Sequence, residues 1–269
     1  MNTVNAPVII GGCHRSGTSL LRRIINAHSR IYCGPEVKFF RDFYSDYFHD
    51  PLNHLRFSTS ARSMLPEAQL LDILGDCFVR IHEAAARNFN KPRWADKCPE
   101  NVLFLDKWDE ILGEHWYFVH VLRNPVDVIA SMEEAGFDLA VPTGLEARIA
   151  FYIRYTEAGL DFSERHPDRS YRVWYEDVVA DPRREISQLM NWLGEEFELN
   201  QLDYNQAARH QPGLEDPNVR GENSVHARSV GRGSQAFSTE QLHEIQSGMA
   251  GLWKRLGANP DLLFPERAV

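Results

Sequence analysis

The sequence predicts an α/β fold in three layers, with a central parallel sheet flanked by helices. One observation behind this prediction is that short apolar runs of strand type alternate along the chain with longer segments of helical periodicity. Another is Trp116–Leu122, which is apolar at nearly every position, as expected of a strand covered on both faces. Because 269 residues, of which 43% are hydrophobic, suffice for a full core, we expect a single domain over residues 1–269.

In the first half of the chain, Val8–Gly11 is an apolar strand, and the glycine-bounded turn after it leads into a helix over Thr18–His28. The alternation continues with an extended segment, Arg30–Cys33, and an aromatic-rich helix that contains Phe40, Phe43, Tyr44, Tyr47 and Phe48. Pro66 opens a long helix, whose apolar residues are Leu70, Leu74, Cys77, Phe78 and Ile81. A short strand, Trp94–Asp96, precedes a helix over Glu100–Leu112, which ends at Gly113.

In the second half, the strand Trp116–Leu122 runs into Asn124, a predicted N-cap, and Pro125, a predicted first helical residue. The helix that Pro125 opens continues through Met132, and a long helix, Leu145–Glu164, follows it. Next come a strand, Tyr171–Tyr175, and a helix that is capped by Asp181-Pro182 and ends near Gly194. An extended loop over 207–235 leads to a final helix, which begins with the capping box of Ser238 and Gln241 and runs through Leu256.

The charge and cysteine content exclude several classes of function. A net charge of −9 argues against general attraction to nucleic acid or an anionic membrane, so an anionic ligand must be held by local cations. We see no signal peptide and no membrane-spanning run, and we expect a cytoplasmic protein without membrane insertion. Four cysteines are spaced too widely for a metal site or a disulfide framework, which predicts reduced thiols and no metal, at Cys13, Cys33, Cys77 and Cys98.

The turn between the first strand and helix is the strongest functional signal. Gly12 and Gly17 are separated by four residues and followed by Thr18 and Ser19, so the loop is P-loop-like, with backbone N–H groups and the helix dipole directed at one anion. Thr18 replaces the lysine that reaches the terminal phosphates of a nucleoside triphosphate. Arg15 supplies a cation instead. The alternative is a tight strand–helix turn with an incidental arginine.

Two further segments could hold a second anion. Arg123 follows the predicted central strand, and Ser131 lies two turns into the next helix. A late glycine-rich segment, 229–234, permits close backbone approach to a ligand, and Arg228 and Arg232 add charge. Solvated arginines and a small packing serine are the alternatives. Two separate anion-binding sites (grips) at neighbouring strand ends, one at the loop with Arg15 and one at Arg123 and Ser131, favour a ligand that is phosphorylated at two places.

Glu36 and Lys97 are candidate catalytic groups near the same edge of the sheet. A carboxylate beside the phosphate loop suits a general base, and a lysine at a strand end suits charge on a leaving oxygen. The alternatives are a surface glutamate, and a lysine paired with Asp96 or Glu100. Three histidines are rival bases, although His28 fits a helix cap and His120 a hydrogen-bonded core residue better, and His14 lies inside the loop.

Together these residues resemble the sulfotransferases that use 3′-phosphoadenosine 5′-phosphosulfate (PAPS), closest to the protein-tyrosine sulfotransferases and related bacterial enzymes. The resemblance implies in-line sulfuryl transfer to an acceptor hydroxyl, with 3′,5′-bisphosphoadenosine (PAP) as product. It implies Glu36 as general base, and Lys97 and Arg15 as groups that stabilise the leaving phosphate. The cofactor-binding residues that it implies are Arg15, Ser16, Gly17, Thr18 and Ser19 for the 5′-phosphosulfate, Arg123 and Ser131 for the 3′-phosphate, Tyr175 for the nucleotide, and Arg228, Ser229, Gly231 and Arg232 in a late loop over the 3′-phosphate and adenine.

The chain departs from the tyrosylprotein pattern at two positions. Pro35 replaces the first glutamate of a pair, and Ala135 stands where that branch has a further cofactor-binding arginine. We also expect no membrane anchor. Small-molecule, glycan and peptide hydroxyls therefore all remain candidate acceptors. Two other functions stay open from the residues alone: a P-loop small-molecule kinase, which the arginine at the end of Trp116–Leu122 disfavours, and a non-catalytic nucleotide-binding module.

Overall fold

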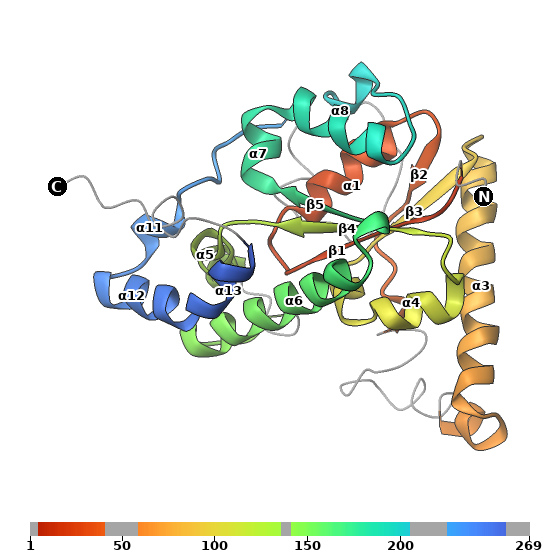
Figure 1. Ribbon diagram of the computed structural model, residues 1–269, viewed down its shortest axis with the longest axis horizontal. Coiled ribbons are helices and arrows are strands. Elements are labelled where there is room, and N and C mark those ends of the chain that lie inside the picture. Colours follow the sequence, from red (N-terminus) through yellow and green to blue (C-terminus); the bar gives the residue numbers. More distant parts are fainter. Residues whose placement is uncertain (1–4, 41–58, 136–140, 205–224, 257–269) are drawn as a thin grey trace.

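A five-stranded parallel sheet forms the centre of the molecule, confirming the predicted fold class. The computed structural model describes residues 5–40, 59–135, 141–204 and 225–256. The strand order is β2-β3-β1-β4-β5, and every neighbouring pair is parallel (Figure 1). Ile10 lies opposite both Lys97 and Val119, which brings the ends of three strands to one edge. The strands are β1 (Val8–Gly12), β2 (Ile31–Cys33), β3 (Arg93–Lys97), β4 (Tyr117–Leu122) and β5 (Ser170–Trp174).

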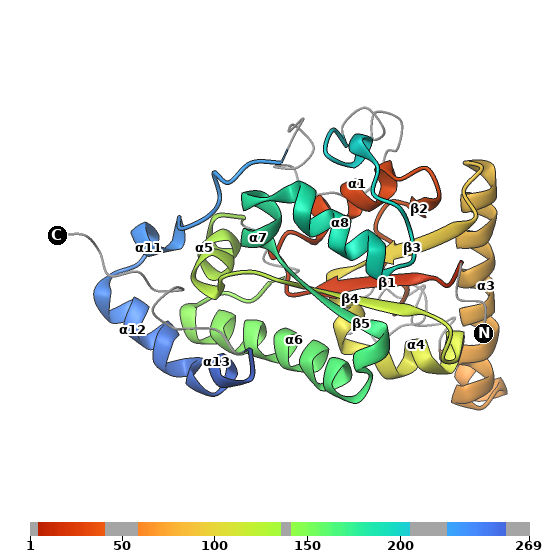
Figure 2. The same ribbon diagram turned by 45° about the horizontal axis from the view of Figure 1, so that its top comes forward.

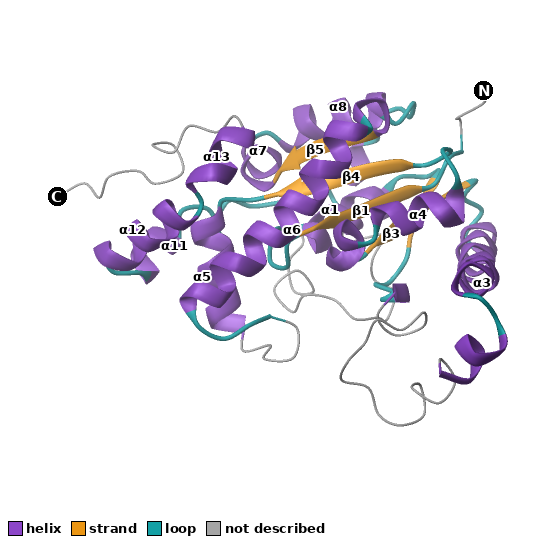
Figure 3. Ribbon diagram, turned by 60° about the horizontal axis from the view of Figure 1, so that its bottom comes forward, coloured by secondary structure: helices purple, strands orange, loops and turns teal. Residues whose placement is uncertain are grey.

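Helices cover both faces of the sheet, giving the three predicted layers. In Figure 1, α1, α7 and α8 lie on one face, and α4 and α6 lie on the other. Figure 3 shows α12 beside α6 at the end of the molecule where α5 also lies. The described helices are α1 (Thr18–Ala27), α3 (Glu67–Asn88), α4 (Leu105–Leu112), α5 (Pro125–Ala135), α6 (Leu145–Arg165), α7 (Tyr175–Ala180), α8 (Pro182–Trp192), α11 (Gly233–Ala236), α12 (Thr239–Gly248) and α13 (Ala250–Leu256).

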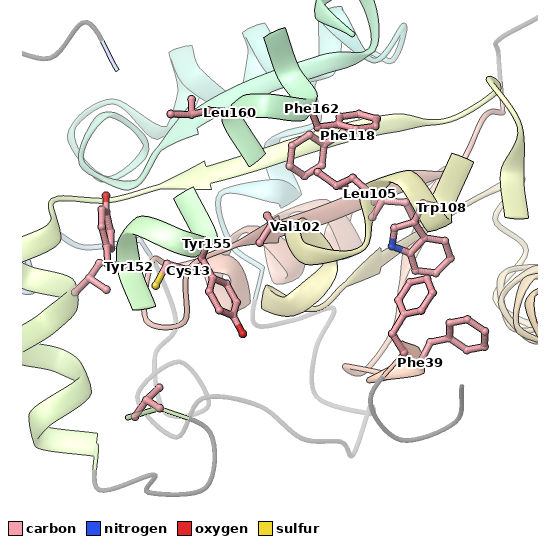
Figure 4. Close-up of a cluster of buried hydrophobic side chains, with 14 of the residues drawn as sticks. Cys13, Phe39, Val102, Leu105, Trp108, Phe118, Tyr152, Tyr155, Leu160 and Phe162 are labelled. Carbon is pink, nitrogen blue, oxygen red and sulfur yellow. The ribbon is translucent and has the colours of Figure 1, made fainter. Parts of the chain in front are cut away.

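The two faces of the sheet bury separate apolar cores. Successive side chains of a strand point to opposite faces, so Val8 and Ile10 pack against α1 and α8, whereas Ile9 belongs to the other core. That second core contains an aromatic cluster in which Phe39 lies beside Trp108, with ring centroids 6.0 Å apart (Figure 4). Phe40 is buried in the same cluster, as predicted for a core residue. The other members of the predicted aromatic helix fall outside the described residues.

Three predicted helix caps are present. Asn124 Oδ1 accepts a hydrogen bond from Val126 N at 2.9 Å, directly before Pro125 opens α5. Asp181 accepts from Arg184 N at the start of α8, and Ser238 forms the predicted capping box of α12. Because each side chain satisfies an amide that the first helical turn leaves without an acceptor, these boundaries were readable from sequence.

The structure corrects four predicted elements. The helix predicted over Glu100–Leu112 is a 3₁₀ helix, Pro99–Leu103, followed by α4 after Phe104. The final helix is two helices, α12 and α13, separated at Met249. Tyr175 begins α7 rather than ending a strand. The extended loop predicted over 207–235 is described only from residue 225, and its last residues open α11.

Two predicted core assignments are also wrong. Leu70, Leu74 and Phe78 on α3 are buried, but Cys77 and Ile81 on the same helix are exposed. α3 stands at one side of the molecule (Figure 2), and among the described elements it packs against β2, β3 and α4. His120 is fully buried as predicted, yet neither ring nitrogen has a hydrogen-bond partner within the described residues. Burial, with a smaller effect of Arg172, lowers the pKa of His120 to about 3, so the imidazole is neutral at pH 7.

None of the helices that the structure describes combines the length and the apolar character that crossing a membrane requires.

Candidate active site

The loop after β1 has the backbone geometry of an anion cradle. Arg15 (φ 69°) and Gly17 (φ 93°) both adopt left-handed conformations, and Ser16 N donates to Cys13 O at 3.2 Å. The first helical bond of α1 runs from Leu21 N to Gly17 O, so the amides at the start of the helix have no helical acceptor. These amides and the positive end of the helix dipole lie together at the carboxyl edge of the sheet, as the spacing predicts.

Tyr175 closes one side of this loop. A Cβ atom on Gly17 would lie 2.5 Å from Tyr175 Cδ2, so glycine is required there both by its φ and by the ring packed against it. The Arg123 guanidinium stacks over the other part of the same ring, 4.6 Å from its centroid. Burial raises the pKa of Tyr175, although Arg123 and a hydrogen bond with Ser229 oppose this effect. The phenol therefore stays protonated.

Arg123 connects the loop to the late segment. Its side chain is buried, with Nη1 donating to Arg15 O at 2.8 Å and Nη2 donating to Ser229 O at 2.6 Å. The Tyr152 hydroxyl donates to the Arg123 carbonyl at 2.8 Å, which fixes the backbone at the end of β4. The predicted partnership of Arg123 with Ser131 is indirect: Ser131 Oγ instead accepts from Arg15 Nε at 3.1 Å. Arg15 thus links the two predicted phosphate grips.

A buried aspartate that the sequence reasoning missed holds the late segment in place. Asp127, near the start of α5, accepts from Gly231 N and from Gly233 N, each at 2.7 Å. A Cβ atom on Gly233 would lie 2.4 Å from Val126 O, so this glycine permits close approach to α5 rather than to a ligand. The sequence signal that could have identified Asp127 is its position two residues after Pro125, in the first turn of the helix. A carboxylate there can accept hydrogen bonds from backbone amides of another segment.

Both arginines of the late segment, Arg228 and Arg232, are exposed. Ser229 and Gly231 contact site residues, but Arg232 forms an ion pair with Glu134 at the surface.

Glu36 and Lys97 meet beside the phosphate loop. Lys97 ends β3, its side chain is 1% exposed, and its ammonium donates to Glu36 Oε2 and, at 3.3 Å, to Ser19 Oγ. The alternative partners are engaged elsewhere: Asp96 accepts from Asn101 Nδ2 at 2.8 Å, and Glu100 pairs with Lys38. The two candidate catalytic groups are therefore in direct contact and within reach of the loop.

Lys38 joins Glu36 to Glu100, and Glu100 in turn faces His14. Lys38 was not singled out from the sequence, and Glu100 was considered only as a partner of Lys97. Lys38 Nζ lies 3.3 Å from Glu36 Oε1 and 3.0 Å from Glu100 Oε1. Cys98 Sγ donates to Glu100 Oε2 at 2.8 Å, and His14 Nε2 lies 3.3 Å from Glu100 Oε1. Potential metal-ligand atoms of Glu36, Cys98 and Glu100 fall within 4.8 Å of one another, but the Lys38 ammonium already supplies a positive charge to both carboxylates.

The cradle suits an oxygen-rich anion. Within the described residues, Ser16 Oγ and Arg123 Nε are buried and have no hydrogen-bond partner. Both can donate, and they stand beside the amides of α1 and the Arg15 cation. Because unpaired buried donors are costly, these atoms fit phosphate oxygens, which accept several hydrogen bonds at once.

Comparisons with known proteins agree with this fold. Residues 7–199 match the model of the sulfotransferase family. A curated relative, the "Putative protein-tyrosine sulfotransferase" of Caenorhabditis briggsae, is 22% identical over 249 residues, covering 88% of this chain and 84% of the relative. The sulfotransferase domain of the Synechococcus PCC 7002 olefin synthase has a TM-score of 0.67 at 18% identity, covering 95% of each chain. Mouse sulfotransferase SULT7A1, solved in complex with PAP, has a TM-score of 0.50 at 13% identity, covering 93% of this chain and 84% of that one.

The chain belongs to the sulfotransferase family, because the family model matches more than half of it. It is thus a member of a family of transferases that move sulfuryl groups, and the predicted resemblance is confirmed.

Proposed function

We propose that this protein transfers a sulfuryl group from PAPS to an acceptor hydroxyl, with Glu36 as general base. The observation that carries the proposal is the contact of Glu36 and Lys97 beside Ser19 of the phosphate loop. This contact supports the proposal because a carboxylate that can accept a proton and a cation lie together beside a residue of the loop.

The donor would be held by residues that follow three strands, β1, β4 and β5, together with Ser131 on α5 and the late segment. The amides of Gly17, Thr18 and Ser19, with the Ser16 hydroxyl and the Arg15 cation, suit the 5′-phosphosulfate. Arg123 and Ser131 suit the 3′-phosphate, and Tyr175 with the Ser229–Gly231 segment would border the nucleotide. Arg228 and Arg232 flank that segment in the sequence and would have to turn toward the nucleotide from their exposed positions. The relative solved with PAP supports this choice of donor. We expect no metal in the reaction, because the grips consist of cations and amides.

The chain's own residues then perform two tasks. PAPS supplies an activated sulfuryl group, and the transfer breaks its bond to a 5′-phosphate oxygen. Glu36 accepts the proton of the acceptor hydroxyl as that oxygen bonds to sulfur. Lys97, Arg15 and the loop amides stabilise the negative charge that develops on the departing phosphate oxygen. Since Lys97 also contacts Ser19, a small movement of its ammonium from Glu36 toward the loop suffices.

Ligand-induced stabilisation tests the donor assignment. PAP at about 100 times its Kd should raise the Tm by about 5 °C, whereas ATP with Mg²⁺ at the same concentration should raise it by less than about 1 °C. Arg123→Met removes charge-assisted bonds to a phosphate and should reduce the PAP shift to about 1 °C.

Arg80→Met is the matched control, because Arg80 is exposed on α3 and its ion pair within the described residues, with Asp76, is a surface contact that contributes little. This variant should keep the full shift with PAP. Stabilisation by ATP–Mg²⁺ alone would contradict the proposal and favour a kinase.

A further inference from the structure

Lys38 lies between the carboxylates of Glu36 and Glu100, and the proposed mechanism gives Lys38 no role. Its ammonium lies 3.3 Å from Glu36 Oε1 and 3.0 Å from Glu100 Oε1, and its side chain is 13% exposed. Each oxygen of Glu36 therefore faces a different lysine, Lys97 at Oε2 and Lys38 at Oε1. A carboxylate held at both oxygens has a defined orientation, which a base needs for in-line geometry.

The backbone that carries Lys38 is anchored by the two residues after it. Phe39 and Phe40 are 2% and 3% exposed, and their rings are 4.9 Å apart. Phe40 stacks on Phe104 with a centroid distance of 4.6 Å, and Phe39 packs on Phe78 at 4.7 Å. Figure 4 shows Phe39 pointing into the aromatic core next to Trp108. Lys38 is thus presented from a rigid support.

Glu100 is fixed just as firmly on the other side of Lys38. It follows β3 in the 3₁₀ helix Pro99–Leu103, accepts from Cys98 Sγ, and faces His14, whose ring packs on Phe151 and Tyr155. Burial acts to raise the pKa of Glu100, but His14 and Lys38 outweigh it, so the pKa lies well below its usual range. Burial likewise acts to lower the pKa of Lys38, and Glu100 and Glu36 outweigh it. Both groups remain charged near neutral pH.

Lys97 cannot serve Glu36 throughout the proposed reaction. Its ammonium is needed at the departing phosphate oxygen, on the Ser19 side, at the moment when Glu36 receives a proton. Within the part of the chain that the structure describes, the Lys38 ammonium pairs with Glu36 and Glu100, neither of which belongs to the loop. It is therefore the cation that stays on Glu36 when Lys97 moves.

We propose that Lys38, held by Glu100, is a positioning residue that keeps the Glu36 carboxylate aimed at the acceptor hydroxyl while Lys97 serves the leaving group. The inference rests on the proposed function, because it requires Glu36 to be the base. Lys38 acts through Glu36 and touches neither the donor nor the reacting atoms.

Steady-state kinetics with labelled PAPS tests the proposal first in three single variants. Lys38→Met should lower kcat by about 10- to 100-fold through misorientation of the base, with the Kd for PAP changed by less than about threefold. Lys38→Arg should restore most of kcat, because it keeps a cation between the two carboxylates. Glu100→Gln should lower kcat in the same direction, again without loss of PAP affinity.

The decisive variant is Lys38→Met combined with Glu36→Gln. If Lys38 acts through Glu36, the double variant has the residual rate of Glu36→Gln alone. A further drop in the double variant, an increase in the Kd for PAP that parallels the loss of activity, or an unchanged kcat in Lys38→Met and Glu100→Gln would each overturn the inference. If Lys38→Met does not fold, Lys38→Arg and Glu100→Gln carry the same test. An active Glu36→Gln enzyme would instead refute the base assignment in the proposed function, so the two failures are distinguishable.

Discussion

Glu36→Gln is expected to lower kcat for sulfuryl transfer by about 10³- to 10⁴-fold while leaving PAP binding intact. The amide keeps the shape of the side chain and one acceptor oxygen for Lys97 or Lys38, but it cannot take the proton of the acceptor hydroxyl. Because the phosphate loop is built from Arg15 to Ser19 and does not include Glu36, the Kd for PAP should change by only a few-fold. Transfer of labelled sulfuryl groups and calorimetric titration with PAP measure the two quantities.

Glu114→Gln is the matched control for this substitution. Glu114 is exposed in the turn before β4, at the opposite edge of the sheet from the phosphate loop. We expect full activity from it. An active Glu36→Gln enzyme would remove Glu36 from the role of base and return attention to His14, the histidine that lies inside the loop.

Lys97→Met should lower kcat by about 10²- to 10³-fold, because it removes the cation nearest to the departing phosphate oxygen. Lys97 is buried and its ammonium faces only Glu36 and Ser19 among the described contacts, so its main contribution is electrostatic. An interaction that strengthens only in the transition state affects kcat more than substrate affinity. The Kd for PAP is therefore expected to rise much less than kcat falls, as single-turnover rates and calorimetry can show.

Lys254→Met, an exposed substitution on α13, controls for the loss of one positive charge. The prediction is wrong if Lys97→Met raises the Kd for PAP by as large a factor as it lowers kcat. In that outcome Lys97 contributes to ground-state binding of the donor rather than to the transition state.

The parts of the fold that sequence predicted best are those with local, chemically specific signals. The strand after Trp116 is apolar at nearly every position because helices cover both faces of β4, and Asn124-Pro125 encodes the cap and first residue of α5. The spacing of Gly12 and Gly17 encodes a turn whose left-handed φ and tight packing on Tyr175 leave no room for a side chain. Each of these patterns depends on residues that are neighbours in the chain.

The errors arise where tertiary contacts override local periodicity. Glu100 to Leu112 has a helical pattern, yet Asn101 reaches Ile10 O and Asp96, which holds the first turn as a 3₁₀ helix before α4. Ile81 fits the apolar period of α3, but it lies on an exposed face of that helix. No local signal marks such a face, because its exposure depends on where the rest of the chain ends up.

In the candidate site, too, some features were predictable from sequence and others depend on tertiary contacts. Arg15, Arg123 and Tyr175 were expected at the carboxyl edge from topology, and the structure places them in contact. The contact of Lys97 with Glu36 joins residues 61 positions apart, and the Lys38–Glu100 pair joins residues 62 apart. Spacing cannot predict such pairs. They exist because β2 and β3 are adjacent strands whose following segments meet at one edge.

The most direct test of the central claim is transfer of ³⁵S from labelled PAPS to a mixed panel of phenolic, sugar, lipid-alcohol and tyrosyl-peptide acceptors, with PAP measured in the same reactions. The account predicts a labelled product from at least one class of acceptor, formed together with PAP in equal amounts and without added divalent metal. Tight binding of PAP without a labelled product from any class would contradict it and leave a nucleotide-binding protein that does not transfer sulfuryl groups.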